Sequence, residues 1–68
     1  MSARTKEETD LRRKIKSAQA LYDLSNNDMA IKMHMSLPAW ERRLQNPGKI
    51  SFMELCRINR ILKMNLLN

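Results

Sequence analysis

A proline two residues after a serine, near the middle of the chain, limits the fold more than any other feature. Pro38 has no backbone N–H and its ring clashes with the preceding turn of a helix, so it is tolerated only in a first helical turn. Ser36 is a favourable N-cap residue, so a helix is expected to begin at about Leu37. Any preceding helix must end before Ser36. The centre of the chain is therefore expected to hold two short helices joined by a tight turn.

The earlier of these two helices has its own start signal. Ser25 is a candidate N-cap, and Asp28 three residues later makes an acidic variant of the capping box. The apolar stripe of this helix is predicted to consist of Met29, Ala30 and Met33. With a short turn around His34-Met35-Ser36, the pair forms a predicted helix-turn-helix unit over about residues 26–45.

Helical periodicity also marks both ends of the chain. A helix is predicted from about Glu7 to Asp23 because apolar residues recur there at spacings of four, three and four. Its buried face would hold Leu11, Ile15, Ala18 and Tyr22, and its opposite face Arg12, Arg13, Lys16 and Gln19. Ser51 and Glu54 form a full capping box for a last helix. The buried stripe of that helix is predicted to be Phe52, Leu55, Ile58 and Leu62.

The helix that begins at Leu37 has two distinct sides. At about 100° per residue, Trp40 and Leu44 share one side and are expected to anchor the core. The other side carries Pro38, Glu41, Arg42 and Gln45. The segment Asn46-Pro47-Gly48 is expected to end this helix, with Gly48 free to adopt the positive φ that such an end often needs.

These patterns predict an all-α fold, a compact bundle of four to five short helices in one domain over residues 7–68, preceded by a flexible arm over residues 1–6. At 68 residues, with one cysteine and one histidine, the chain cannot form an internal disulfide or a structural zinc site. Cys56 is expected to be an inert, partly buried thiol, and the methionines to pack in the core. No nucleophile or carboxylate pair has a positioned base, so we expect neither an enzyme nor a cofactor.

The charge distribution points to a polyanionic partner. The net charge is +6 overall, −1 over residues 1–10 and +7 from Leu11 onward. Nucleic acid is the usual partner for such a domain, with a solvated surface or an anionic membrane as alternatives. Arg12, Arg13, Lys14 and Lys16 could contact phosphates, but a solvated helix face is the favoured interpretation. No apolar run approaches the roughly 18 residues of a membrane span, and no secretory signal is apparent, so a cytoplasmic protein is expected.

A set of residues across the three later helices carries a family resemblance. It comprises Met29-Ala30, Met35-Ser36, Trp40, Leu44, Ile50-Ser51-Phe52-Met53-Glu54-Leu55, Ile58 and Leu62-Lys63-Met64. The pattern resembles the Cro/C1-type, lambda repressor-like helix-turn-helix family of phage and bacterial repressors, over roughly residues 15–64. Arg42-Arg43-Leu44-Gln45-Asn46-Pro47 is similar to the end of the recognition helix in short phage regulators. The resemblance implies a sequence-specific transcription regulator that places residues 37–45 in the major groove of double-stranded DNA.

The resemblance also implies which residues touch DNA. Base contacts would fall on Leu37, Pro38, Glu41 and Arg42. Phosphate contacts would fall on Asn26, Asn27, Gln45, Asn46 and Lys49. Arg43 lies beside the buried side of the helix and is a weaker candidate. Because Leu37, Pro38 and Ala39 stand where the family often has Gln, Ser or Thr, sequence reading would depend heavily on Arg42, whose guanidinium suits guanine.

Two further expectations concern the turn and the partners. The resemblance places His34 where the family usually has the glycine of the turn, so His34 should adopt a positive φ. A homodimer on a pseudo-palindromic operator is expected, with Met64, Leu66 and Leu67 as candidates for part of the dimer contact. The alternative is a helix-turn-helix domain that binds protein and docks on a repressor or another regulator, which the apolar start Leu37-Pro38-Ala39 would suit.

Overall fold

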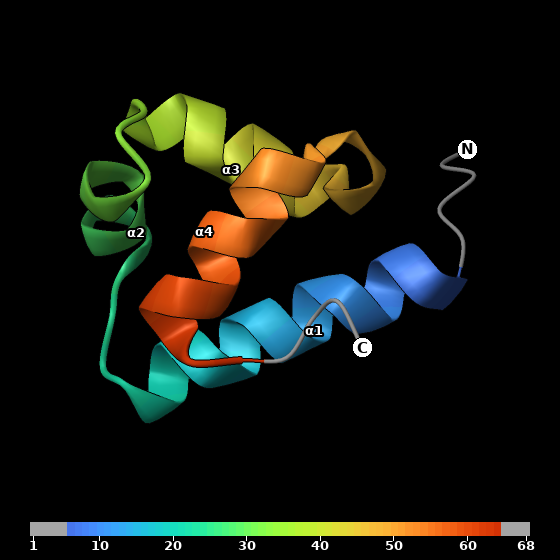
Figure 1. Ribbon diagram of the computed structural model, residues 1–68, viewed down its shortest axis with the longest axis horizontal. Helices are drawn as coiled ribbons and strands as arrows, with labels where there is room; N and C mark the ends of the chain where they lie inside the picture. Colours follow the sequence, from blue (N-terminus) through green and yellow to red (C-terminus); the bar gives the residue numbers. More distant parts are fainter. Residues whose placement is uncertain (1–5, 65–68) are drawn as a thin grey trace.

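A computed structural model describes residues 6–64, and over that range the chain is all-helical without a β-strand (Figure 1). The elements are α1 (Lys6–Leu21), α2 (Asn26–Lys32), α3 (Leu37–Gln45), the 3₁₀ helix η1 (Pro47–Lys49) and α4 (Phe52–Leu62). In the view of Figure 1, α4 runs between α3 and α1, and α2 lies beside the start of α3. The predicted all-α class is confirmed. Helix α1 begins one residue inside the predicted arm, whose residues 1–5 lie outside the described part.

Three serines cap the starts of α2, α3 and α4, as predicted. Ser25 Oγ accepts the N–H of Asp28 at 3.1 Å, and the Asp28 carboxylate accepts the Ser25 N–H at 3.0 Å. Ser36 Oγ accepts the N–H of Ala39 at 3.2 Å, with Pro38 in the first turn of α3. At α4, Ser51 Oγ accepts the Glu54 N–H at 3.1 Å. Each cap satisfies a backbone donor that the helix itself cannot pair.

Three helices end on a left-handed residue that is not glycine. Asp23, His34 and Lys63 have φ values of 56°, 59° and 50°. After α2, His34 N–H donates to Ile31 O and Met35 N–H donates to Ala30 O, the paired bonds of a Schellman motif. The positive φ predicted for His34 is confirmed.

Helix α3 ends at the predicted segment, but Gly48 does not use the positive φ that is open to it. Helix α3 stops at Gln45 because Pro47 cannot donate a backbone hydrogen bond and pushes Asn46 out of the helical region, to φ −130° and ψ 71°. Gly48 lies in η1, where a β-carbon would overlap the Glu8 carboxylate of α1. These atoms are the end of a flexible side chain, so a larger residue at position 48 would require only that the Glu8 side chain move.

The core joins all four α-helices. It consists of Ile15, Met29, Ala30, Met33, Trp40, Leu44, Ile50, Ile58 and Leu62. Trp40 is completely buried and Cys56 is half-buried, as expected. Leu11, Ala18, Met35, Leu55 and Met64 pack against the core from partly buried positions. Leu66 and Leu67, the other candidates for the dimer contact, lie outside the described residues.

Four side-chain placements differ from the prediction. Gln19, expected on the solvent face, is only 2% exposed, because it follows Ile15 by four residues and so shares its face. Tyr22 is 41% exposed, because α1 ends at Leu21 before reaching it. Phe52 and Met53 are 65% and 74% exposed, at the first turn of α4. Core packing therefore does not account for Met53 or Phe52.

Candidate nucleic-acid interface

Helix α3 has one buried side and one exposed side. Trp40 and Leu44 are 0% and 5% exposed and fix the helix to the core. The exposed side carries Pro38, Glu41, Arg42 and Gln45. Leu37 differs from the other proposed base contacts because it is half-buried and packs against the core. The outer side of α3 thus offers polar and charged groups that a partner can reach.

A surface groove connects α3 with the two preceding helices. It has a volume of about 270 Å³ and is lined by Arg12, Lys16, Asn26, Glu41, Leu44 and Gln45. Three of the residues proposed for DNA contact, Asn26, Glu41 and Gln45, meet here. The lining side chains include two cations and one carboxylate, so the groove carries a net positive charge.

The sequence favours a solvated face for Arg12 and Lys16, outside the predicted site. They lie four residues apart and therefore project from the same side of α1. That side borders the groove rather than open solvent alone. The signal in the sequence is the four-residue spacing itself, since Lys14 lies just as close as Lys16 to the fully buried Ile15. The sequence does not show that the start of α2 and the end of α3 meet at this side of α1.

A buried amide positions Asn26 at one wall of the groove. Asn26 Oδ1 accepts two hydrogen bonds, from Lys16 Nζ at 3.1 Å and from Gln19 Nε2 at 3.0 Å. The Gln19 amide also donates to Leu24 O at 3.2 Å. Its own oxygen is buried without a hydrogen-bond partner. Gln19 therefore links the end of α1 to the start of α2, and it leaves the Asn26 amide nitrogen as the group that can donate to a ligand.

The other proposed phosphate contacts, Asn27, Asn46 and Lys49, do not line this groove. Asn27 is exposed in the first turn of α2. Asn46 and Lys49 are exposed just after α3, where the Lys49 N–H donates to Asn46 O at 2.9 Å. These three side chains are exposed on the segments that come before and after α3 in the chain.

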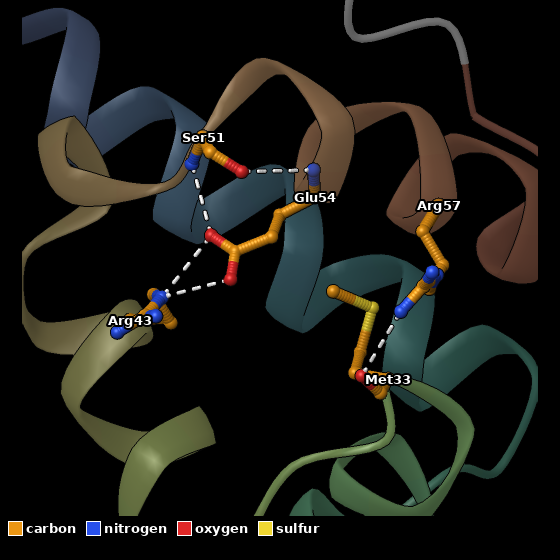
Figure 2. Close-up of polar contacts among 5 residues, drawn as sticks. All are labelled: Met33, Arg43, Ser51, Glu54 and Arg57. Atoms are coloured by element: carbon orange, nitrogen blue, oxygen red, sulfur yellow. Dashed lines mark hydrogen bonds and ion pairs between the residues drawn. The ribbon is translucent and has the colours of Figure 1, made fainter.

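Arg43 pairs with Glu54 at the contact between α3 and α4. Its Nε lies 3.1 Å from Glu54 Oε1 and 3.3 Å from Glu54 Oε2, as Figure 2 shows. Burial opposes ionisation of Glu54, but hydrogen bonds from Arg43 and from Ser51 outweigh it and hold the pKa of this carboxyl below its usual range. Arg43 therefore connects α3 to α4, which leaves Arg42 as the exposed arginine of α3.

A second arginine supports the turn before α3. Arg57 of α4 donates from a guanidinium nitrogen to the backbone oxygen of Met33 at 3.3 Å (Figure 2). This carbonyl belongs to the last residue before His34, where α2 ends. Helix α4 thus contacts both helices that flank the turn, through Arg57 and through Glu54.

Comparisons with models of protein families, with curated proteins and with solved structures find no match. Within residues 6–64, no helix is long and apolar enough to span a membrane. The same residues contain no group of three or more side chains that could hold a metal ion. The arrangement of the site therefore has to be interpreted from its own side chains, charge and exposure.

Proposed function

We propose that the protein is a sequence-specific regulator that binds double-stranded DNA, built on a helix-turn-helix unit of the Cro/C1 type formed by α2 and α3. Helix α3 lies in the major groove, which is wide enough for a single helix. Arg42 and Glu41 contact base edges, and Pro38 contributes an apolar contact. Leu37 contributes only its exposed part. Asn26, Asn27, Gln45, Asn46 and Lys49 contact phosphates.

The observation that carries the proposal is the division of α3 into a buried and a charged side. Trp40 and Leu44 fix the helix, and Arg42 and Glu41 are exposed on the opposite side. Arginine offers a planar pair of donors for guanine O6 and N7, and a carboxylate accepts from cytosine N4. Basic groups on α1 and η1, beside this side of α3, supply attraction to phosphate that does not depend on sequence.

The regulatory mechanism that follows is steric. A dimer binds two half-sites of a pseudo-palindrome whose centres lie about 34 Å apart, one turn of DNA. An occupied operator then blocks or redirects RNA polymerase. A dimer is needed because one domain of this size buries too little surface for tight binding by itself.

Selection of bound duplexes from a random pool, followed by a salt titration, tests the proposal. Enrichment of a palindromic motif would report binding, symmetry and spacing together. If about four phosphates are contacted per subunit, log K falls with log salt with a slope near −3.6 per subunit. No enrichment and a flat salt dependence would overturn the proposal.

Binding to another regulator protein is the second candidate, and the exposure of α3 gives it less support. Of the apolar start of α3, only Pro38 is exposed, whereas Leu37 and Ala39 are half-buried. Little apolar area is therefore offered to a protein groove at that position. A glutamate at Leu37 or Ala39 should abolish capture of a cognate repressor if this second function operates.

A further inference from the structure

Hydrogen bonds join Lys16 and Gln19 of α1 to Asn26 of α2 beside the groove between α1 and α3, a link that the sequence did not indicate. Lys16 and Gln19 both donate to the same oxygen, Asn26 Oδ1, at 3.1 Å and 3.0 Å. Gln19 is 2% exposed, so its amide is fixed by the protein interior rather than by solvent. Two donors on one oxygen determine which way the Asn26 amide faces, since the nitrogen could not accept them. The Asn26 NH₂ group remains available to donate.

The charge of the same groove suits a phosphodiester. Arg12 and Lys16 line it from α1, and Gln45 and Glu41 line it from α3. The Glu41 carboxylate opposes an anion, but the two cations leave the groove with a net positive charge. The Lys16 ammonium has three N–H donors, of which the hydrogen bond to Asn26 uses one. An anion placed between Lys16, Arg12 and Asn26 would therefore receive charged and neutral donors together. Charged hydrogen bonds of this kind are stronger than neutral ones.

We propose that Arg12, Lys16 and Asn26 form a clamp for one DNA backbone phosphate, with Gln19 as the residue that positions the Asn26 amide. This inference rests on the proposed function, because the phosphate belongs to the duplex that α3 reads. It adds α1 to the interface. It also explains why a polar residue occupies a buried position of α1, at the cost of one unpartnered amide oxygen.

The isosteric variant Asn26→Asp separates the clamp from the fold. Its carboxylate can still accept from Lys16 and Gln19, and an acidic residue is favourable in the first turn of a helix. We expect the melting temperature to be unchanged or raised. The outward donor becomes an anionic oxygen, so binding to a random-sequence duplex of about 20 base pairs should weaken by about tenfold or more.

Lys14→Gln is the matched control, because it removes the same unit of charge from another side of α1. Lys14 lines a different hollow, with Glu7, Asp10 and Leu11. Because Arg12 and Lys16 share one phosphate, replacing both with Gln should reduce the steepness of log K against log salt by about 0.9. Each single variant, Lys16→Gln or Arg12→Gln, should lose part of that amount, whereas Lys14→Gln should stay near wild type. Gln19→Leu, measured at a temperature where circular dichroism shows it folded, should weaken duplex binding without changing the slope by a full unit.

The outcomes distinguish the clamp from the function on which it rests. If the wild-type chain binds the duplex but Lys16→Gln, Arg12→Gln and Asn26→Asp all behave like Lys14→Gln, the clamp is overturned and DNA binding stands. If the wild-type chain does not bind any duplex at low salt, both proposals fail. Weakening by all three variants, with Lys14→Gln near wild type, supports the clamp.

Discussion

Arg43 Nε lies 3.1 Å from Glu54 Oε1, and the same carboxylate oxygen accepts the backbone N–H of Ser51 at 2.9 Å. One carboxylate thus serves as the cap of α4 and as the ion-pair partner of α3. Arg43 is adjacent to Arg42, the exposed arginine proposed to read a base. The orientation of the outer side of α3 is therefore connected to α4 as well as to the core through Trp40.

Glu54→Ala should destabilise the protein by about 1–2 kcal/mol. It removes the reciprocal half of a capping box and leaves the Ser51 N–H without this partner. Arg43→Ala should cost less, about 0.5 kcal/mol, because the side chains of the pair are 34% and 21% exposed and the pair is screened by solvent. Urea unfolding followed by circular dichroism measures both. A larger loss for Arg43→Ala than for Glu54→Ala would contradict this order.

Stability should decrease in acid because of the same carboxyl group. The folded-state pKa of Glu54 is lowered, against the opposing effect of its burial, by hydrogen bonds from Arg43 and Ser51. Its contribution is complete above the ordinary glutamate pKa of about 4.3 and is lost as pH falls through the lower folded value. Asp28, whose pKa is lowered first by the backbone N–H of Ser25, acts in the same direction.

Urea unfolding at neutral pH and at about pH 3 measures this acid dependence. Glu54→Gln should be less stable than wild type at neutral pH, and the two proteins should approach each other in acid. A constant difference between them at both pH values would show that ionised Glu54 is not the source of the dependence.

The starts of α2, α3 and α4 could be predicted from the sequence because each depends on a local cap. Ser25, Ser36 and Ser51 bond to backbone groups three residues away, so no tertiary information is needed. The burial of Gln19 could not be predicted from its polarity, because the groups that accept from its amide nitrogen, Leu24 O and Asn26 Oδ1, lie beyond the end of α1. The four-residue spacing from the buried Ile15 puts Gln19 on the same side of α1, whereas its polar side chain favours the solvent-facing placement that the structure contradicts.

The groove could not be predicted from the sequence, for a related reason. Its walls come from α1, α2 and α3, and a helical projection of any one of them does not show where the others cross. Phe52 likewise fits the periodicity of α4 with Leu55, yet it is 65% exposed at the first position of the helix. Helical periodicity predicts the side of the helix on which a residue lies. Burial also requires that another element pack against that side at the same point along the helix axis.

His34→Gly should stabilise the protein by up to about 1 kcal/mol. His34 has a φ of 59°, a conformation that is costly for most residues and that glycine adopts without steric cost. The greater freedom of glycine in the unfolded chain offsets part of the gain. His34→Ala, which keeps the β-carbon, is the control and should not be stabilising. Thermal melts of the two variants check the difference, and a stabilising alanine would show that the histidine ring, not φ, is unfavourable.

Trp40→Phe should cost less than an ordinary large-to-small core change. Trp40 is fully buried and its Nε1 has no hydrogen-bond partner. Phenylalanine leaves a cavity but also removes an unpaired buried donor, whose desolvation costs about 1–3 kcal/mol. We expect a net loss below about 1.5 kcal/mol, against about 3–5 kcal/mol for Trp40→Ala. Urea unfolding by circular dichroism applies to both, and a loss for Trp40→Phe as large as for Trp40→Ala would contradict this account.

Arg42→Lys and Arg42→Ala should separate base reading from charge. Alanine is expected to weaken specific binding by about 1–3 kcal/mol and to relax the preference at one base pair. Lysine keeps the charge but loses the planar fork, so it should retain the salt dependence while losing most of the discrimination. Arg60→Ala is the control, because Arg60 is an exposed arginine on α4. Binding to a selected duplex and to single-base variants measures all three. If Arg42→Ala lowers the affinity equally on every sequence, Arg42 contacts only phosphate, and the recognition of sequence has to come from Glu41 and the shape of the groove.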